Sequence, residues 1–281
     1  MAKVLTKSCV EDKVVSSGVT VELTCCACFL MSGMSKIQQH KSRVIATSKK
    51  PQTALHRVAV LNEKPLHAAL KEWYAQPGDR LELSVDGFVV DIVRGHLLVE
   101  IQTGNFAAIK RKLAKLTVRH PVRLVYPIAR DKWIVKLAED GHGQLSRRKS
   151  PKRGAIEHVF EELVSFPELL LNPNFSIELL LIQEEEIRRY DAIRGWRRKG
   201  WVTYERQLLR VMERRLFRVP ADIGTLVPSA LSEPFTTSDL ALAIAKPRRL
   251  AQKMVYCLRL MGCITQTGKI GNAILYSRAT T

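Results

Sequence analysis

Long apolar runs are absent from the 281-residue sequence. No segment has the roughly 20 consecutive apolar residues that a membrane-spanning helix requires. The apolar stretch 25–31 is short, follows the acidic residues Glu11, Asp12 and Glu22, and lacks the basic start of a secretory signal. We therefore expect a protein that is neither inserted in a membrane nor exported.

Cysteine is also scarce. The six cysteines are too few and too scattered to form a disulfide framework. The tight group Cys25, Cys26 and Cys28 has no second ligand pair at zinc-site spacing, whereas a structural zinc ion is normally held by four ligands. A metal-binding role and an ordinary apolar or unstructured role both stay open for this group. The cysteine usage predicts a reducing environment and a cytoplasmic location.

Acidic residues are few relative to basic ones. The chain has 27 Asp and Glu against 45 Lys and Arg, which gives a formal net charge of +18. Such a charge produces a field that attracts polyanions. We therefore expect a nucleic-acid partner, with DNA as the first choice and RNA as an alternative. The oligomeric state is left open, a homodimer being one possibility.

The chain is long enough for more than one compact unit, and four regions differ in their residue pattern. They are a poorly structured leader over residues 1–62, an α/β core over 63–140, a basic linker and mainly helical extension over 141–225, and a C-terminal module over 226–281. In the leader, Met34 precedes a polar, basic run, so a translation start at Met34 is a hypothesis. Peptides from upstream of Met34 in native protein would refute it.

The α/β core has a regular order of predicted elements. Leu66, Leu70 and Trp73 recur at helical spacing and predict a helix that ends before Pro77-Gly78. Period-two alternation then predicts a three-stranded meander. Its strands lie over 80–85, 88–93 and 96–102. The meander is followed by a helix over 105–120, capped by Asn105, and by strands over 122–128 and 132–137. Helix, meander, helix and strand together indicate an α/β fold.

Two acidic residues in the meander are expected to share one face of the sheet. If Arg94-Gly95 forms a two-residue turn, Asp91 and Glu100 become diagonal neighbours separated by about 7–8 Å at the backbone. Gln102 projects from the same face. Two carboxylates at this spacing can share a divalent cation. The alternative is that they are simply polar positions on a half-exposed hairpin.

The sequence from 65 to 137 resembles the PD-(D/E)XK nuclease superfamily. The resemblance rests on Asp91, the short hairpin, Glu100-Ile101-Gln102 and a preceding helix that bears Glu72. It implies a restriction-endonuclease-like mixed sheet flanked by helices. It also implies that Mg²⁺ or Mn²⁺ is held by Asp91, Glu100 and the Ile101 carbonyl, and that Asp91, Glu100, Gln102 and Glu72 are the catalytic residues.

Gln102 departs from the family pattern, because the family usually has lysine at this position. A glutamine amide can orient a water molecule, but it supplies no positive charge and does not titrate as a base. Lys110 or Lys112 in the following helix can bring a cation to the site instead.

Basic residues are concentrated in the extension over 141–225. The polar connector 141–153 carries Arg147, Arg148 and Lys149, and helical periods over 156–171 and 203–217 flank a strand-like run over 175–182. Arginine alternates with Tyr and Trp after residue 188, a composition that can grip phosphates and stack on bases. The nucleic-acid contacts expected there are Arg194, Arg197, Arg198 and Lys199. The alternative is a solvated helix face whose aromatic residues are core and whose arginines pair with Glu184–Glu186.

The C-terminal module resembles a winged helix. Thr236 or Thr237 can cap a first helix through Ala245, Pro247 can open a second helix that Gly262 closes, and a hairpin is predicted over 264–276. The residues expected to contact nucleic acid from the second helix are Arg248, Arg249, Gln252, Lys253 and Arg259. This resemblance implies duplex binding, although such modules also bind proteins.

Three functions follow from the sequence. The first is a Mg²⁺-dependent DNA phosphodiesterase of the PD-(D/E)XK type. The second is a DNA-binding protein that retains this fold without catalysis, and the third is a winged-helix transcriptional regulator whose central domain senses a ligand. Metal-dependent cleavage separates the first from the other two, and tight, sequence-selective binding without metal marks the third.

Overall fold

A computed structural model describes residues 64–138, 143–194, 196 and 199–279. The leader over 1–62, the Met34 hypothesis, the Cys25, Cys26 and Cys28 group, and the predicted contacts Arg197 and Arg198 all lie outside these residues. Within the described part of the chain, no helix is both long enough and apolar enough to cross a membrane.

The predicted first helix and meander are present. Helix α1 (Pro65–Tyr74) begins with a proline, whose missing N–H is harmless in the first turn, and precedes strands β1 (Arg80–Val85), β2 (Phe88–Arg94) and β3 (Leu97–Ile101). Asp86 and Gly87 both have positive φ in the two-residue turn between β1 and β2. A type I′ turn requires this conformation at both positions, so the Asp-Gly signal predicted the hairpin correctly.

The second turn lies one residue later than predicted. Arg94 pairs with Leu97, so Gly95 and His96 form the loop instead of Arg94 and Gly95. Gly95 has a φ of +57°, and the first central position of a type II′ turn favours glycine for this reason. The β2–β3 register therefore differs from the predicted one by two residues.

Helix α2 (Phe106–Leu116) connects β3 to β4 (Val122–Leu137), and the two strands are parallel. The two strands predicted over 122–128 and 132–137 are one long strand. A register shift between Ala129 and Asp131, where β4 pairs with β6, explains the apparent break in the pattern.

The extension that was predicted as mainly helical consists largely of strands. Strands β5 (Gln144–Lys149), β6 (Phe175–Tyr190) and β7 (Trp201–Phe217) join the same sheet, whose order is β1-β2-β3-β4-β6-β7 with β5 paired to β4. The helix predicted over 203–217 is wrong, because this segment pairs with β6 along its length as β7. Short helical turns precede β6, as η1 (Ile156–Val159), α3 (Phe160–Leu163) and η2 (Pro167–Leu171).

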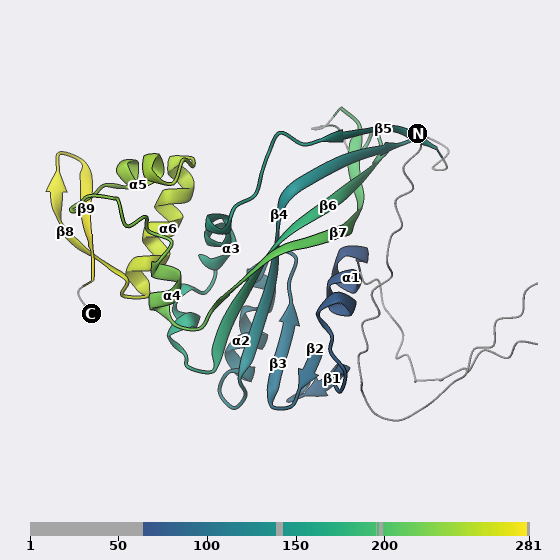
Figure 1. Cartoon of the computed structure of the whole chain (residues 1–281), viewed down its shortest axis with the longest axis horizontal. Coiled ribbons are helices and arrows are strands. Elements are labelled where there is room, and N and C mark those ends of the chain that lie inside the picture. Colours follow the sequence, from purple (N-terminus) through teal and green to yellow (C-terminus); the bar gives the residue numbers. More distant parts are fainter. Residues whose placement is uncertain (1–63, 139–142, 195, 197–198, 280–281) are drawn as a thin grey trace, which may run out of the picture. The chain divides into compact units, whose positions relative to one another are not determined.

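Helices cover both faces of the mixed sheet (Figure 1). On one face, α1 buries Leu66 and Leu70 against a cluster that includes Val99 and Val125. On the other face, Phe106 and Leu113 of α2 belong to a larger cluster that continues into the C-terminal helices. The expected α/β sheet flanked by helices is therefore confirmed.

The C-terminal part contains α4 (Pro220–Gly224), α5 (Thr237–Ala243), α6 (Arg248–Leu260) and the hairpin β8 (Ile264–Ile270) and β9 (Ala273–Arg278). Thr236 caps α5, because its hydroxyl accepts the N–H groups of Ser238 and Asp239. Buried Met254 and Leu258 line the inner side of α6. The predicted pair of helices and the predicted hairpin are thus confirmed as elements.

Candidate active site

Asp91 and Glu100 come from adjoining strands, at the end of their ladder. Ile92 and Val99 are the last pair of the β2–β3 ladder, and continuing the same register by one residue places Asp91 opposite Glu100. The sequence predicted a diagonal relation. The register differs from the predicted one by two residues. Val90 and Val93, three residues apart, both belong to the cluster on the α2 side, so the period-two alternation is interrupted around Asp91. Asp91 contacts His67 of α1, whereas Glu100 contacts Lys112 of α2.

The Asp91 carboxylate is held by the backbone of β3 and by α1. Its Oδ2 atom accepts the Ile101 N–H at 2.7 Å and lies 3.3 Å from Nε2 of His67. Within the described residues, Oδ1 accepts no hydrogen bond. The backbone of Ile101, a predicted metal ligand through its carbonyl, therefore lies directly against Asp91.

Glu100 is buried and contacts a lysine of α2. Nζ of Lys112 donates to Oε1 of Glu100 at 2.5 Å and to the Val89 carbonyl at 2.6 Å. Burial, with the charge of Asp91 as the next cause, raises the pKa of Glu100 to about 7, against the opposing effects of Lys112 and His67. Oε2 of Glu100 is buried and has no hydrogen-bond partner among the described residues.

These oxygen atoms fit a divalent cation. A buried carboxylate oxygen without a partner carries a desolvation cost that a bound cation would remove. Mg²⁺ prefers oxygen ligands and retains several water molecules, so two carboxylates and a carbonyl are a sufficient protein contribution. No group of three or more His, Cys, Asp or Glu side chains gathers for metal binding in the described ranges, so carbonyl oxygen and water would complete the shell.

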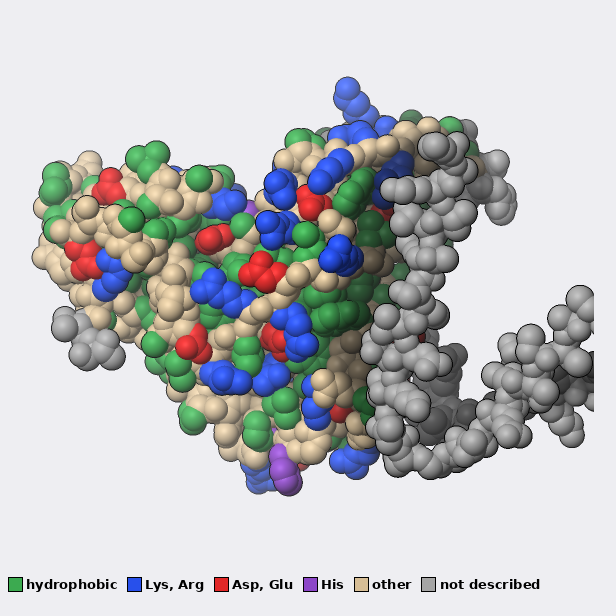
Figure 2. Space-filling model, in the orientation of Figure 1, with side chains coloured by type: hydrophobic (Ala, Val, Ile, Leu, Met, Phe, Trp, Pro, Cys, Tyr) green, Lys and Arg blue, Asp and Glu red, His purple; other side chains and the backbone are tan. Residues whose placement is uncertain are grey.

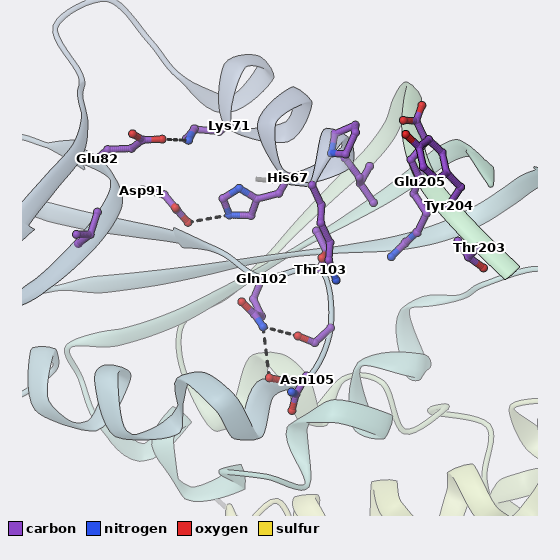
Figure 3. Close-up of a pocket in the computed structure, with 16 residues that line it drawn as sticks. His67, Lys71, Glu82, Asp91, Gln102, Thr103, Asn105, Thr203, Tyr204 and Glu205 are labelled. Atoms are coloured by element: carbon purple, nitrogen blue, oxygen red, sulfur yellow. Dashed lines mark hydrogen bonds and ion pairs between the residues drawn. The ribbon is translucent and has the colours of Figure 1, made fainter. Parts of the chain in front are cut away.

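A pocket of about 900 Å³ opens beside Asp91. Its walls come from the start of α1, from β1 and β2, from the 102–105 loop and from residues 203–206 of β7 (Figure 3). Lys71 forms an ion pair with Glu82 there, and Glu82 has a φ of +52°, which is uncommon for a residue with a side chain. Such backbone conformations are often found at active sites.

Two of the four predicted catalytic side chains are not directed at the carboxylate pair. The Gln102 amide donates to the carbonyl of Gly104 and, at 3.3 Å, to that of Asn105, so it turns toward the loop before α2 (Figure 3). Glu72 is exposed on α1, and in the described structure no hydrogen bond or ion pair joins it to Asp91 or Glu100. The α1 residue that contacts Asp91 is His67.

The sequence contained a signal for His67. Leu70 and Tyr74 are apolar and lie three and seven residues after it, so all three residues share one helical face, whereas Glu72 is rotated away. The suggestion that Lys112 reaches the site agrees with its contact to Glu100, while Lys110 is exposed.

The basic residues predicted to bind nucleic acid differ in their surroundings. On β5, Arg147 pairs with Glu185 at 2.6 Å and Lys149 pairs with Asp131 at 2.9 Å, while Arg148 is exposed. Arg194 and Lys199 are exposed near the turn between β6 and β7. Figure 2 shows Lys and Arg side chains spread over one face of the molecule with acidic side chains among them.

The predicted contact residues of α6 are mostly accessible. Arg248, Arg249, Gln252 and Arg259 are exposed. Lys253 differs, because its Nζ donates to the Glu161 carbonyl at 3.2 Å and is thereby directed toward α3.

The acidic run in β6 pairs with basic residues, as the alternative interpretation of the basic tract expected. Glu184 is fully buried between Lys132 at 2.9 Å and Arg206 at 2.5 Å. Glu186 pairs with Lys132 at 3.0 Å and Arg188 at 2.7 Å. Part of the basic charge is therefore neutralised within the sheet.

Comparison with protein families identifies the sheet-forming region. Residues 64–218, more than half of the chain, match a domain of unknown function, DUF8091. The chain belongs to the DUF8091 family. The DUF8091 region starts at α1 and ends just after β7, so it includes Asp91, Glu100 and the pocket, whereas α4 to β9 follow it.

One relative is an uncharacterized protein of Treponema pallidum (strain Nichols). It is 33% identical over 180 residues, which are 64% of this chain and 71% of the relative. No solved structure matches the DUF8091 chain.

Proposed function

We propose that this DUF8091 protein is a nucleic-acid-binding protein that cleaves DNA phosphodiester bonds with Mg²⁺ or Mn²⁺, as a nuclease of the PD-(D/E)XK type. The observation that carries the proposal is the pair Asp91 and Glu100 at the end of the β2–β3 ladder. The order α1, β1 to β3, α2 and β4, with β3 parallel to β4, supports a restriction-endonuclease-like arrangement of the elements around this pair.

The proposed chemistry assigns separate tasks to the residues. Asp91, Glu100 and the Ile101 carbonyl would hold the cation, which when bound supplies charge neutralisation and an activated water. His67 orients Asp91 through its 3.3 Å contact. Lys112 brings a positive charge next to Glu100. In this proposal, Lys112 replaces the lysine that the family usually has at the position of Gln102.

DNA binding is proposed to involve the C-terminal helices. The order α5, α6 and hairpin β8–β9 supports a winged-helix-like module, with the exposed Arg248, Arg249 and Arg259 of α6 toward the DNA. Near the pocket, the residues that stack on DNA bases and contact DNA phosphates would belong to the DUF8091 region.

A cleavage assay with charge-neutral variants tests the proposal. Asp91→Asn and Glu100→Gln each remove one negative charge at nearly constant size, and we expect both to abolish Mg²⁺-dependent nicking of plasmid DNA. Asp86→Asn is the matched control, because Asp86 lies in the preceding turn and asparagine tolerates its positive φ of 48°. Equal nicking by the four proteins, or nicking that persists in EDTA, would discard the catalytic assignment.

A binding protein without catalysis is the second candidate function. It is favoured by the Gln102 amide, which is engaged with the loop carbonyls instead of pointing to the carboxylate pair. This function predicts salt-dependent DNA binding by the unmodified protein, no cleavage with Mg²⁺ or Mn²⁺, and unchanged binding by Asp91→Asn.

A further inference from the structure

We propose that the pocket beside Asp91 receives an unpaired strand of DNA and stacks one of its bases on Tyr204. This inference rests on the proposed function, because it assigns a substrate class to the same site. Its physical basis is the wall that β7 builds across the pocket from Asp91 and Glu82 (Figure 3).

Tyr204 occupies an irregular position in β7. Ile187 of β6 pairs with Glu205, and the next residue, Arg188, pairs with Thr203, so Tyr204 is the extra residue of a β-bulge. A bulge redirects a side chain and is often found next to an active site. The Tyr204 residue lines the pocket close to the start of β7 and is 54% exposed, so its ring is accessible from the pocket.

A guanidinium group supports the ring. Arg189 lies with its Cζ atom 3.6 Å from the centre of the Tyr204 ring. Similar contacts are found on other strands of the sheet. Lys136 of β4 lies 4.2 Å from the Trp201 ring of β7, and Arg147 of β5 lies 5.2 Å from the Trp133 ring of β4. Aromatic rings interleaved with cations are the arrangement with which proteins bind single strands, since bases stack on the rings and phosphates meet the cations.

The size of the pocket also favours one strand over two. A volume of about 900 Å³ lies within the range of pockets that enclose a drug-sized molecule, so it holds a few nucleotides of one strand. A base pair stacked in a duplex presents only its edges in the grooves, whereas an unpaired base presents the flat face that a tyrosine ring can contact.

Fluorescence anisotropy with the full chain in EDTA tests this inference without cleavage. The probes are a short fluorescein-labelled oligothymidylate and a hairpin duplex. We expect Tyr204→Ala to weaken oligothymidylate binding by roughly tenfold, the effect of one lost base stack, and to leave duplex binding within about twofold. Tyr204→Phe keeps the ring and should bind like the unmodified protein.

Two further variants make the result decisive. Leu209→Ala removes an exposed apolar side chain of β7 that does not line the pocket, and it should leave binding of both probes unchanged. Tyr204→Leu keeps apolar bulk without a planar ring, and it should lose affinity as Tyr204→Ala does, even if the alanine variant is unstable. Unchanged oligothymidylate binding in Tyr204→Leu, or an equal loss for both probes, overturns the inference.

The outcome is separable from that of the cleavage assay. Selective loss of single-strand binding in EDTA supports the inference even if Asp91→Asn shows that no cleavage depends on the carboxylate pair. Metal-dependent cleavage with unchanged binding by the Tyr204 variants overturns the inference and leaves the proposed catalysis in place.

Discussion

The Lys112 ammonium group compensates a buried carboxylate. It donates hydrogen bonds to the carboxylate of Glu100, a residue that is 7% exposed, and to the Val89 carbonyl. Removing one partner of a buried ion pair is more destabilising than removing both, because the remaining charge has lost both water and its partner. The stability of this part of the sheet therefore depends on the two residues together.

We expect Lys112→Met to lower the free energy of unfolding by roughly 2–3 kcal/mol at pH 8, because Glu100 must then either stay charged without its partner or take up a proton. Adding Glu100→Gln to this variant should recover most of the loss, because no buried charge is left. Urea denaturation of the two single variants and the double variant gives the coupling free energy. If the double variant is as unstable as the sum of the single ones, Lys112 does not act through Glu100.

His67 and Glu72 both lie on α1, but only His67 of these two contacts Asp91. A residue that orients a metal ligand typically contributes ten- to hundredfold to metal affinity or activity. We therefore expect His67→Ala to reduce Mg²⁺-dependent cleavage by roughly that factor and to raise the Mg²⁺ concentration needed for half activity. Glu72→Gln should leave both quantities unchanged. A loss of activity in Glu72→Gln alone would show that the α1 contact to Asp91 is not the important one.

The pairing of β2 with β3 could be predicted from sequence, because a short turn joins the two strands. A turn displaced by one residue changes the register by two and places Asp91 opposite Glu100, whereas the interrupted alternation around Asp91 depends on packing that the sequence pattern does not show. The contact of His67 could not be predicted with the same ease, because it depends on how α1 is rotated against the sheet. Only burial of Leu70 and Tyr74 fixes that rotation.

At the scale of elements, strands β6 and β7 are joined by charges as well as by backbone hydrogen bonds. Burial alone would raise the pKa of Glu186, but hydrogen bonds from Lys132, Thr203 and Arg188 outweigh burial and lower the pKa from 4.5 to about 2. A carboxyl group with a lowered pKa in the folded state stabilises the protein above its unfolded pKa. That contribution is lost as the pH falls from about 4.5 toward 2.

Glu186→Gln should therefore lower the free energy of unfolding at pH 7, by roughly 3 kcal/mol at most. Near pH 2 the difference from the unmodified protein should largely vanish, because Glu186 is then protonated in the unfolded state and about half protonated in the folded state. Denaturant unfolding at a series of pH values measures this difference. Gln207→Glu, which adds an exposed charge on β7, serves as a control for general charge effects. A pH-independent difference would contradict the assignment.

The irregularities of β7 explain why its secondary structure was predicted incorrectly. The β6–β7 ladder has three register shifts, and each one interrupts the period-two alternation by which a strand is identified in a sequence. A window across such shifts can place apolar residues at intervals of three and four, which resembles a helix. The long pairing with β6, a contact between segments far apart in the sequence, decides the outcome.

At the scale of the whole molecule, the DUF8091 region and the C-terminal helices share hydrophobic core. Phe160 and Leu163 of α3 belong to the same buried cluster as Met254 and Leu258 of α6. The family match nevertheless ends at residue 218, before α4. The C-terminal helices therefore lie outside the matched region but are packed onto it through a shared core, so their exposed basic side chains hold a defined place beside it.

The net charge of +18 belongs to the whole chain, but ion pairs within the sheet neutralise part of it. Cations release counterions from DNA where they contact its phosphates, and each phosphate contact adds about 0.9 to the slope of log affinity against log salt concentration. Arg248 and Arg249 are exposed at the start of α6, whereas the Lys253 amine is bound to the Glu161 carbonyl. Arg248 and Arg249 are therefore accessible to a DNA phosphate, whereas the Lys253 amine is directed toward α3.

We expect Arg248→Ala and Arg249→Ala each to weaken duplex binding across all sequences and to reduce the salt slope by about 1. Lys253→Ala removes the same formal charge from the same helix, but it should change neither the affinity nor the slope appreciably. Anisotropy titrations of a hairpin duplex over a range of KCl concentrations measure both quantities. An equal effect of the three variants would mean that duplex affinity follows total charge, and that α6 has no particular orientation toward the DNA.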